Sequence, residues 1–222
     1  MEVIARIHND FPTKFGLPRQ AGLAPSLRSK IVFEPAYRVA EALRGLEDFS
    51  YIWLIWGFHA CHSERSEESW SPTVRPPRLG GNVRMGVFAT RSPFRPNPIG
   101  LSSVRLEGME KDGDNGLVLI VSGADLMDGT PIYDIKPYLP GVDVHPDATD
   151  GFVGAHRQVL LDVEIDPALA ARLSDTQLST LREILAQDPR PAYHADPSRI
   201  YGLSYAGFDL HFTVEDHRLK AW

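Results

Sequence analysis

Apolar and polar residues alternate along several short stretches of the chain, which is the pattern of β-strands with one buried face. Near the start, Val3, Ala5 and Ile7 alternate with their neighbours, and Tyr51–Phe58 is a strongly apolar, aromatic run. Turn-rich connections separate stretches of similar length further along. The pattern predicts strands around Val3–Ile7, Tyr51–Phe58, Val83–Ala89, Ser102–Glu107, Leu117–Ser122, Gln158–Ile165 and Phe208–Val214.

Helical spacing occurs in two places. Apolar residues recur at Ala36, Val39, Ala40 and Leu43, which predicts a short helix after Pro35 that Gly45 ends. Leucines at helical spacing predict a second helix over about Thr176–Gln187. Many short strands with one modest helix favour a barrel or a sandwich over a series of βαβ units.

The character of the chain changes near Asp166-Pro167, where the second helix and a cleanly alternating strand follow. This combination is typical of a small α+β unit, with its boundary between Ala155 and Asp166. We therefore expect a mainly β fold, with a β domain over residues 1–155 and a small α+β C-terminal domain over residues 156–222. A chain of 222 residues is long enough for that arrangement.

The formal net charge of −6 hides an uneven distribution. Residues 1–110 carry 14 Lys and Arg against 11 Asp and Glu, whereas residues 111–222 carry 9 against 18. Within Ser71–Leu106 there are six arginines and no acid. Such a local excess of cations binds anions whatever the global charge is, although the arginines can equally be solvated or paired with acids elsewhere.

The sequence predicts a cytoplasmic protein. Its first residues form neither a basic leader nor a long apolar stretch, and the run Tyr51–Phe58 is too short to cross a bilayer. Cys61 is the only cysteine, so an internal disulfide is excluded. His59, Cys61 and His62 lie close in sequence, but three candidate ligands within four positions fit a tetrahedral metal poorly, so we expect no metal site.

A first unusual stretch, Gly86–Ser102, contains three prolines within six residues, Pro93 to Pro98. Proline fixes φ and removes a backbone donor, so this must be a stiff loop that holds Arg91, Arg95 and Asn97 in set directions. Guanidinium groups suit a carboxylate or a phosphate, and a pre-organised loop loses little entropy when it binds one. The alternative is a rigid structural turn with exposed charge.

A second unusual stretch, Asp125–Tyr138, contains the turn signal Asp128-Gly129-Thr130-Pro131. Asp128 can accept a hydrogen bond from ribose hydroxyls or from an amine, and Tyr133 and Tyr138 can stack on a base. The alternative is a connection in which Asp128 caps its own backbone.

Together with three further motifs, these stretches resemble the TsaA-like family over about Met1–Pro140, and the family's C-terminal domain is similar to Ala155–Val214. The further motifs are Phe15–Leu23, Trp53–His59 and Val74–Asn82. Characterised members of that family are tRNA methyltransferases that use S-adenosylmethionine (SAM) and act on N6-threonylcarbamoyladenosine at position 37, in the anticodon loop. The resemblance implies a single β-barrel, a SAM pocket built from loops and a homodimer.

Matched residue by residue, the family's cofactor contacts correspond to ten positions here. The resemblance implies that SAM is bound by Pro18, Arg19, Gln20, His59, Arg91, Leu101, Asp128, Gly129, Thr130 and Pro131. No Gly-x-Gly-x-x-Gly motif follows a strand, so a dinucleotide-type fold has no support.

Transfer to a poorly nucleophilic nitrogen needs a hydrogen-bond acceptor or base nearby, and Asp134 and Tyr133 are the candidates, with His59 as a further possibility. The threonyl carboxylate needs a cation, for which Arg75, Arg78 or Arg95 is suitable, and Asn97 and Arg84 complete the expected RNA contacts. Two other functions remain open: a non-catalytic RNA-binding barrel, and a SAM-dependent methyltransferase with another acceptor.

Overall fold

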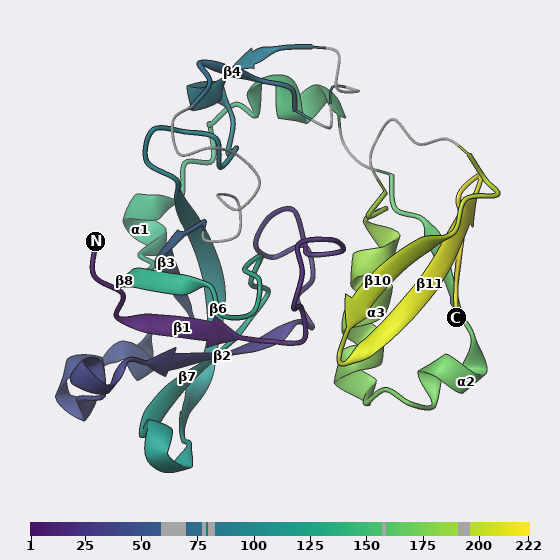
Figure 1. The fold of residues 1–222 in the computed structure, drawn as a ribbon. Coiled ribbons are helices and arrows are strands. Elements are labelled where there is room, and N and C mark those ends of the chain that lie inside the picture. Colours follow the sequence, from purple (N-terminus) through teal and green to yellow (C-terminus); the bar gives the residue numbers. More distant parts are fainter. Residues whose placement is uncertain (59–69, 77–78, 80–82, 157–158, 191–195) are drawn as a thin grey trace.

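The computed structural model describes residues 1–58, 70–76, 79, 83–156, 159–190 and 196–222, and Figure 1 shows its architecture. Six antiparallel strands pair in the order β1-β2-β7-β6-β3-β8, and β8 pairs with β1, so this sheet closes into a barrel. The strands are β1 (Ala5–His8), β2 (Arg28–Phe33), β3 (Tyr51–Gly57), β6 (Ile99–Lys111), β7 (Leu117–Ser122) and β8 (Pro131–Pro137).

Alternating side chains give each barrel strand an inner and an outer face. On β3, Ile52, Leu54 and Trp56 are buried inside the barrel, while Trp53 and Ile55 lie outside and are partly exposed. The buried residues of all six strands form one apolar core. The prediction of a mainly β fold is therefore confirmed.

Short elements surround the barrel. Strands β4 (Thr73–Val74) and β5 (Met85–Gly86) form a two-stranded sheet. The remaining short elements are the 3₁₀ helices η1 (Pro35–Tyr37), η2 (Ala40–Leu43), η3 (Leu46–Asp48), η5 (Val87–Ala89), η6 (Gly113–Asn115) and η7 (Gly151–His156), and the α-helix α1 (Pro140–Asp143).

Two predictions for this part are wrong. The single helix predicted between Pro35 and Gly45 is two separate 3₁₀ turns, η1 and η2, with Val39 extended between them and Leu43 as their one buried residue. The strand over Val83–Ala89 is reduced to β5 followed by η5, with Val87 as its buried anchor. In both places the apolar spacing reflects isolated anchor residues and not a continuous buried face.

The C-terminal part contains a four-stranded sheet in the order β10-β11-β12-β9 (Figure 1). Its strands are β9 (Asp162–Ile165), β10 (Tyr201–Tyr205), β11 (Phe208–Glu215) and β12 (Arg218–Ala221), and its helices are α2 (Pro167–Ala170) and α3 (Asp175–Ala186). A capping box between Ser174 and Gln177 starts α3, which buries Leu181, Ile184 and Leu185. The predicted helix and the strand around Phe208–Val214 are thus confirmed.

The segment between β1 and β2, residues 10–27, packs against this C-terminal part. Figure 1 shows it as the purple loops that extend from the barrel towards α3. Phe11, Ala24 and Leu27 are at most 1% exposed, and they belong to the same apolar core as α3 and the β10–β12 strands. The second core of the protein is therefore completed by residues from near the chain start.

No helix in the described part of the chain is long and apolar enough to span a membrane.

Candidate functional site

Two predicted cofactor residues from distant parts of the sequence meet directly. Nη1 of Arg91 donates a hydrogen bond to Oε1 of Gln20. Arg91 is the second residue of the stretch that we call the proline loop, residues 90–98, and Gln20 lies in the 10–27 segment. Arg91 is exposed, and its guanidinium carries further N–H donors beside the one that Gln20 accepts.

Asp125 connects both of these loops to the barrel. It lies three residues after the end of β7, and its Oδ1 accepts a hydrogen bond of 2.6 Å from Oγ of Ser102 on β6. The Ala21 N–H also donates to its carboxylate, and the charge of Arg91 acts on it. Burial raises the pKa of Asp125 above its usual range, although the bonds from Ser102 and Ala21 and the charge of Arg91 oppose that shift.

The same network continues into the barrel. Nε1 of Trp56 donates to Oγ of Ser102 at 3.0 Å, and both side chains are buried. Trp56 lies directly over Gly100, where a Cβ atom would come within 2.1 Å of the indole ring. Gln20, Arg91, Asp125, Ser102 and Trp56 therefore form a continuous polar network, which we call the mouth network.

A second group of predicted residues lies on the outer face of the barrel. Leu101 of β6 pairs with Ile55 of β3, and Ile55 pairs with Asp134 of β8, so these three residues form one row across adjacent strands. Neighbouring strands are about 4.8 Å apart, which puts Leu101 and Asp134 roughly 10 Å from each other. A predicted cofactor residue and a predicted catalytic residue thus share one face.

Tyr133 owes its position to a β-bulge. The register between β3 and β8 shifts between Ile55 and Trp56, which leaves Tyr133 as the extra residue. Its side chain crosses Gly57, where a Cβ atom would lie 2.2 Å from the tyrosine hydroxyl. Asp134 itself forms an ion pair with Lys136, with 3.0 Å between Oδ2 and Nζ.

The Asp128–Pro131 turn is confirmed as a turn, and it packs against β1. Gly129 has a φ of +75°, and the Thr130 N–H donates to the Met127 carbonyl. Oδ1 of Asp128 lies 3.1 Å from Nδ1 of His8 and accepts from the Asn9 N–H at 3.1 Å. Asp128 is still 41% exposed, whereas Thr130 is buried.

Arg19 and Pro18 take different positions from Gln20. Nη2 of Arg19 donates to the carbonyl oxygens of Asp188 and Arg190, at 3.1 and 3.3 Å, and so contacts the C-terminal part. Pro18 is buried. Of the three consecutive predicted cofactor residues, Gln20 is the one that reaches Arg91.

The predicted RNA-binding residues are spread over the neighbouring loops. Arg75 and Asn97 are exposed, and Nε of Arg84 donates to Oγ1 of Thr73 at 2.9 Å. Nη1 of Arg95 donates to the Thr90 and Ser92 carbonyls within the proline loop. His59 and Arg78 lie outside the described residues.

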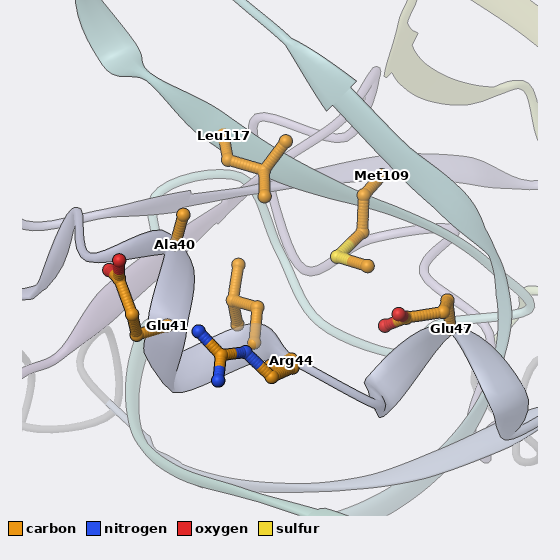
Figure 2. Close-up of a pocket in the computed structure, with 7 residues that line it drawn as sticks. Ala40, Glu41, Arg44, Glu47, Met109 and Leu117 are labelled. Carbon is orange, nitrogen blue, oxygen red and sulfur yellow. The ribbon is translucent and has the colours of Figure 1, made fainter.

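Two shallow cavities occur elsewhere. Figure 2 shows the first, about 280 Å³, in which Met109 and Leu117 lie opposite Ala40, Arg44 and the carboxylates of Glu41 and Glu47. The second, about 290 Å³, lies beside β1 and β2, and its lining includes His8, Arg28 and Lys30. None of the site residues predicted from the sequence lines either cavity, although His8 of the second cavity contacts Asp128. A group of three or more potential metal ligands does not occur in the described ranges, and His59, Cys61 and His62 lie outside them.

Sequence reasoning assigned no role to Asp125, Ser102 or Trp56. One signal was available: Asp125 is an acid three residues after the end of the apolar strand β7, where the chain leaves the barrel. The sequence did not indicate which residues contact Asp125, because Ser102, Ala21 and Arg91 come from three separate segments.

Comparison with known proteins assigns this arrangement to a family. The family model of the tRNA-methyltransferase O N-terminal domain matches residues 6–144, and that of the TrmO C-terminal domain matches residues 158–221. A tRNA (adenine(37)-N6)-methyltransferase of Escherichia coli (strain K12) is 42% identical over 97% of this chain and 93% of its own length.

Two relatives from Pseudomonas aeruginosa agree with this. A protein named as a putative S-adenosylmethionine-dependent methyltransferase is 42% identical over 94% of this chain and 90% of its own length. The crystal structure of TrmO from the same species superposes with a TM-score of 0.78 at 34% identity, covering 99% of this chain and 94% of that one. The chain belongs to the tRNA-methyltransferase O family.

Proposed function

We propose that this protein is a SAM-dependent tRNA methyltransferase that methylates N6 of adenine 37, and that its acceptor is N6-threonylcarbamoyladenosine. The names of the relatives support the enzyme class, the cofactor and the tRNA position. The observation that carries the proposal is the convergence of Gln20, Arg91 and Asp125 at one end of the barrel, beside the outer-face row that holds Leu101 and Asp134.

The residues present fit SAM. The exposed guanidinium of Arg91 suits its carboxylate, and the carboxamide of Gln20 can both donate and accept. Leu101 is 55% exposed and Ile99 is 36% exposed, so apolar surface for the adenine ring of SAM lies beside these polar groups. Asp128, with its partly exposed carboxylate, is available for a hydroxyl or an amine.

Catalysis in this arrangement depends on position and on one proton. When bound, SAM supplies a methyl group activated by a sulfonium sulfur, so no metal is required. Asp134 accepts the proton of the poorly nucleophilic acceptor nitrogen, and Lys136 holds the carboxylate in place. Tyr133, aimed by the bulge across Gly57, orients the acceptor base on the same face.

The arginines around the site provide the remaining recognition. Arg75 is exposed, whereas Nη1 of Arg95 is engaged by two carbonyls of its own loop, so among the described candidates we assign the threonyl carboxylate to Arg75. Arg84 and Asn97 contact the RNA backbone near the anticodon loop. Such contacts make binding strongly dependent on salt.

The exposed apolar residues on the outer face also support a homodimer, because a second copy of the chain would cover Ile99 and Leu101 and enclose the cofactor. We further propose that the division at residues 155 and 156 separates a catalytic β domain from a supporting α+β domain. Such an enzyme acts in the cytoplasm, where its tRNA substrate is found.

A methyl-transfer assay with two tRNAs tests this function. We expect the protein to transfer labelled methyl from SAM to tRNA that carries threonylcarbamoyl on adenine 37, and not to the unmodified transcript. A tRNA with guanine at position 37 is the matched control and should remain unlabelled.

Each competing function predicts a different result. Equal labelling of the unmodified transcript would show a different acceptor. RNA binding without a calorimetric signal for SAM would indicate a non-catalytic RNA-binding barrel.

A further inference from the structure

The 10–27 segment, which supplies Gln20 and the Ala21 N–H to the mouth network, receives most of its packing from the C-terminal part. Phe11 packs on Tyr205 with ring centroids 4.8 Å apart, and Phe15 stacks on Phe212 at 6.3 Å. Gly16 touches Leu203 so closely that a Cβ atom would come within 2.3 Å of it. The apolar contacts therefore hold the segment to the sheet of the C-terminal part.

Polar contacts fix the same segment at both ends. At its start, the Ala206 N–H donates to the Asp10 carbonyl at 3.0 Å, and Nε2 of Gln177 donates to the Asp10 carboxylate at 3.3 Å. Near its end, Glu183 of α3 accepts two hydrogen bonds from Ser26, one from the N–H at 2.9 Å and one from the hydroxyl at 2.7 Å. Hydrogen bonds to a charged carboxylate are stronger than bonds between neutral groups, and the two bonds together fix the orientation of Ser26 relative to Glu183.

A third contact is made in the middle of the segment. The guanidinium of Arg19 binds carbonyls at Asp188 and Arg190, and those two residues are joined by bonds of 2.8 and 2.9 Å from Arg190 to both oxygens of Asp188. This ion pair closes the turn that presents the carbonyls. Arg19 and Gln20 therefore point in different directions, one to the C-terminal part and the other to Arg91.

From these contacts we infer that the C-terminal part is a positioning element for the cofactor site, and that Glu183 is a positioning residue for SAM binding. The inference rests on the proposed function. When Glu183 holds Ser26, the segment keeps Gln20 and the Ala21 N–H in the arrangement that receives the cofactor. When it does not, the segment samples other conformations, and the apparent affinity falls in proportion to the population that remains competent.

The experiment compares Glu183→Ala with Glu164→Ala. Glu164 is a matched control because it lies on β9 of the same part and is exposed. Its Oε2 is 3.8 Å from Nζ of Lys220, which is too far for a hydrogen bond. We expect Glu183→Ala to raise the dissociation constant and the KM for SAM on the order of tenfold. In Glu183→Ala, the kcat at saturating SAM and the KM for tRNA should stay near wild type. Glu164→Ala should leave SAM binding and both of these kinetic constants at the wild-type values.

A second measurement does not depend on activity. In the protein without cofactor, amide hydrogen exchange over residues 10–27 should be faster in Glu183→Ala and unchanged in Glu164→Ala. Glu183→Gln, which keeps one acceptor oxygen, should give an intermediate SAM affinity. Ser26→Ala removes the hydroxyl bond with little risk to folding, and it should weaken SAM binding in the same direction.

The possible outcomes separate the inference from the function on which it rests. A Glu183→Ala protein with wild-type SAM affinity and faster exchange would overturn the positioning role, as would a loss of kcat at unchanged KM. If the wild-type protein gives no SAM binding at all, the proposed function fails and the inference fails with it.

Discussion

The two loops that meet at the contact between Arg91 and Gln20 are held in place by opposite means. The proline loop is braced from within, by its own prolines and by Arg95, which donates to the Thr90 and Ser92 carbonyls. The 10–27 segment is braced from outside, by the C-terminal core and by Glu183. The conformation of the proline loop is thus determined by residues within the loop. The conformation of the 10–27 segment depends on residues far along the chain.

The largest expected effect follows from removing the contact between the two loops. Arg91→Ala should lower kcat/KM on the order of 1000-fold, because it removes the guanidinium that we propose binds the SAM carboxylate. The melting temperature should not change, because Arg91 is exposed. Arg105→Ala is the control, since Arg105 is exposed on β6 beside Glu107. Unchanged turnover in Arg91→Ala would remove it from the site.

Asp134 lies outside both loops, on a strand, so its loss should leave the loop junction intact. We expect Asp134→Ala to lower kcat about 100-fold through loss of the proton acceptor, with little change in SAM affinity. Single-turnover kinetics and calorimetry measure the two quantities. Lys136→Ala keeps the carboxylate and should have a much smaller effect. Wild-type turnover in Asp134→Ala would exclude it as a base.

Asp125 joins both loops to the barrel, and its loss should affect both at once. Asp125→Ala leaves the Ser102 hydroxyl and the Ala21 N–H without their acceptor, which should lower the free energy of unfolding by roughly 2 kcal/mol. We also expect about tenfold weaker SAM binding. Denaturant unfolding checks the first value, and an unchanged midpoint would mean that the network contributes nothing to stability.

The pH dependence of the same site has a definite sign. Burial raises the pKa of Asp125, so the folded protein holds its proton more tightly than the unfolded chain. Relative to Asp125→Asn, the wild type should therefore be most stable below the unfolded pKa of about 3.9 and should lose stability as the pH rises through the raised value. Melting temperatures of both proteins across this range test it. A difference that grows in the opposite direction would contradict the burial effect.

Smaller effects distinguish the two kinds of brace. Arg95→Ala should weaken SAM binding only a few-fold, because the prolines still restrict the loop. Hydrogen exchange should rise in residues 90–98 and stay unchanged in residues 10–27, the reverse of the result expected for Glu183→Ala. Faster exchange of both loops in either variant would show that the braces are not independent.

Arg84, which touches neither loop, should have the smallest effect. Its guanidinium is exposed and contacts Thr73, so Arg84→Ala should reduce tRNA affinity modestly and lower the salt dependence of binding by about one ion contact. Filter binding at several salt concentrations measures this slope, and an unchanged slope would place Arg84 away from the RNA.

This difference in bracing also explains how much the sequence could reveal. Patterns within one segment predicted β7 over Leu117–Ser122, the α3 helix and the turn at Gly129. Strands β2 and β8 were not predicted, because Arg28 and Lys30 give the first a polar character and prolines begin and end the second.

In the candidate site, the resemblance placed Gln20 and Arg91 together, but residue patterns alone could not orient Arg19 or Gln20. Their directions are set by carbonyls at Asp188 and Arg190 and by the side chain of Arg91, all distant in sequence. Asp125 was part of a quoted motif, yet its role depends on Ser102 and Ala21, which no local pattern connects to it.

The packing of Phe11 against Tyr205 has a consequence for synthesis on the ribosome. The chain emerges from its amino end, so the barrel strands are available long before the sheet that covers Phe11, Ala24 and Leu27. Until β10–β12 have been synthesised, these side chains lack the apolar surface against which they pack in the folded protein. The positioning role inferred for the C-terminal part therefore predicts that SAM binding begins only after β10–β12 have folded, and a product that ends before them would leave Phe11, Ala24 and Leu27 exposed.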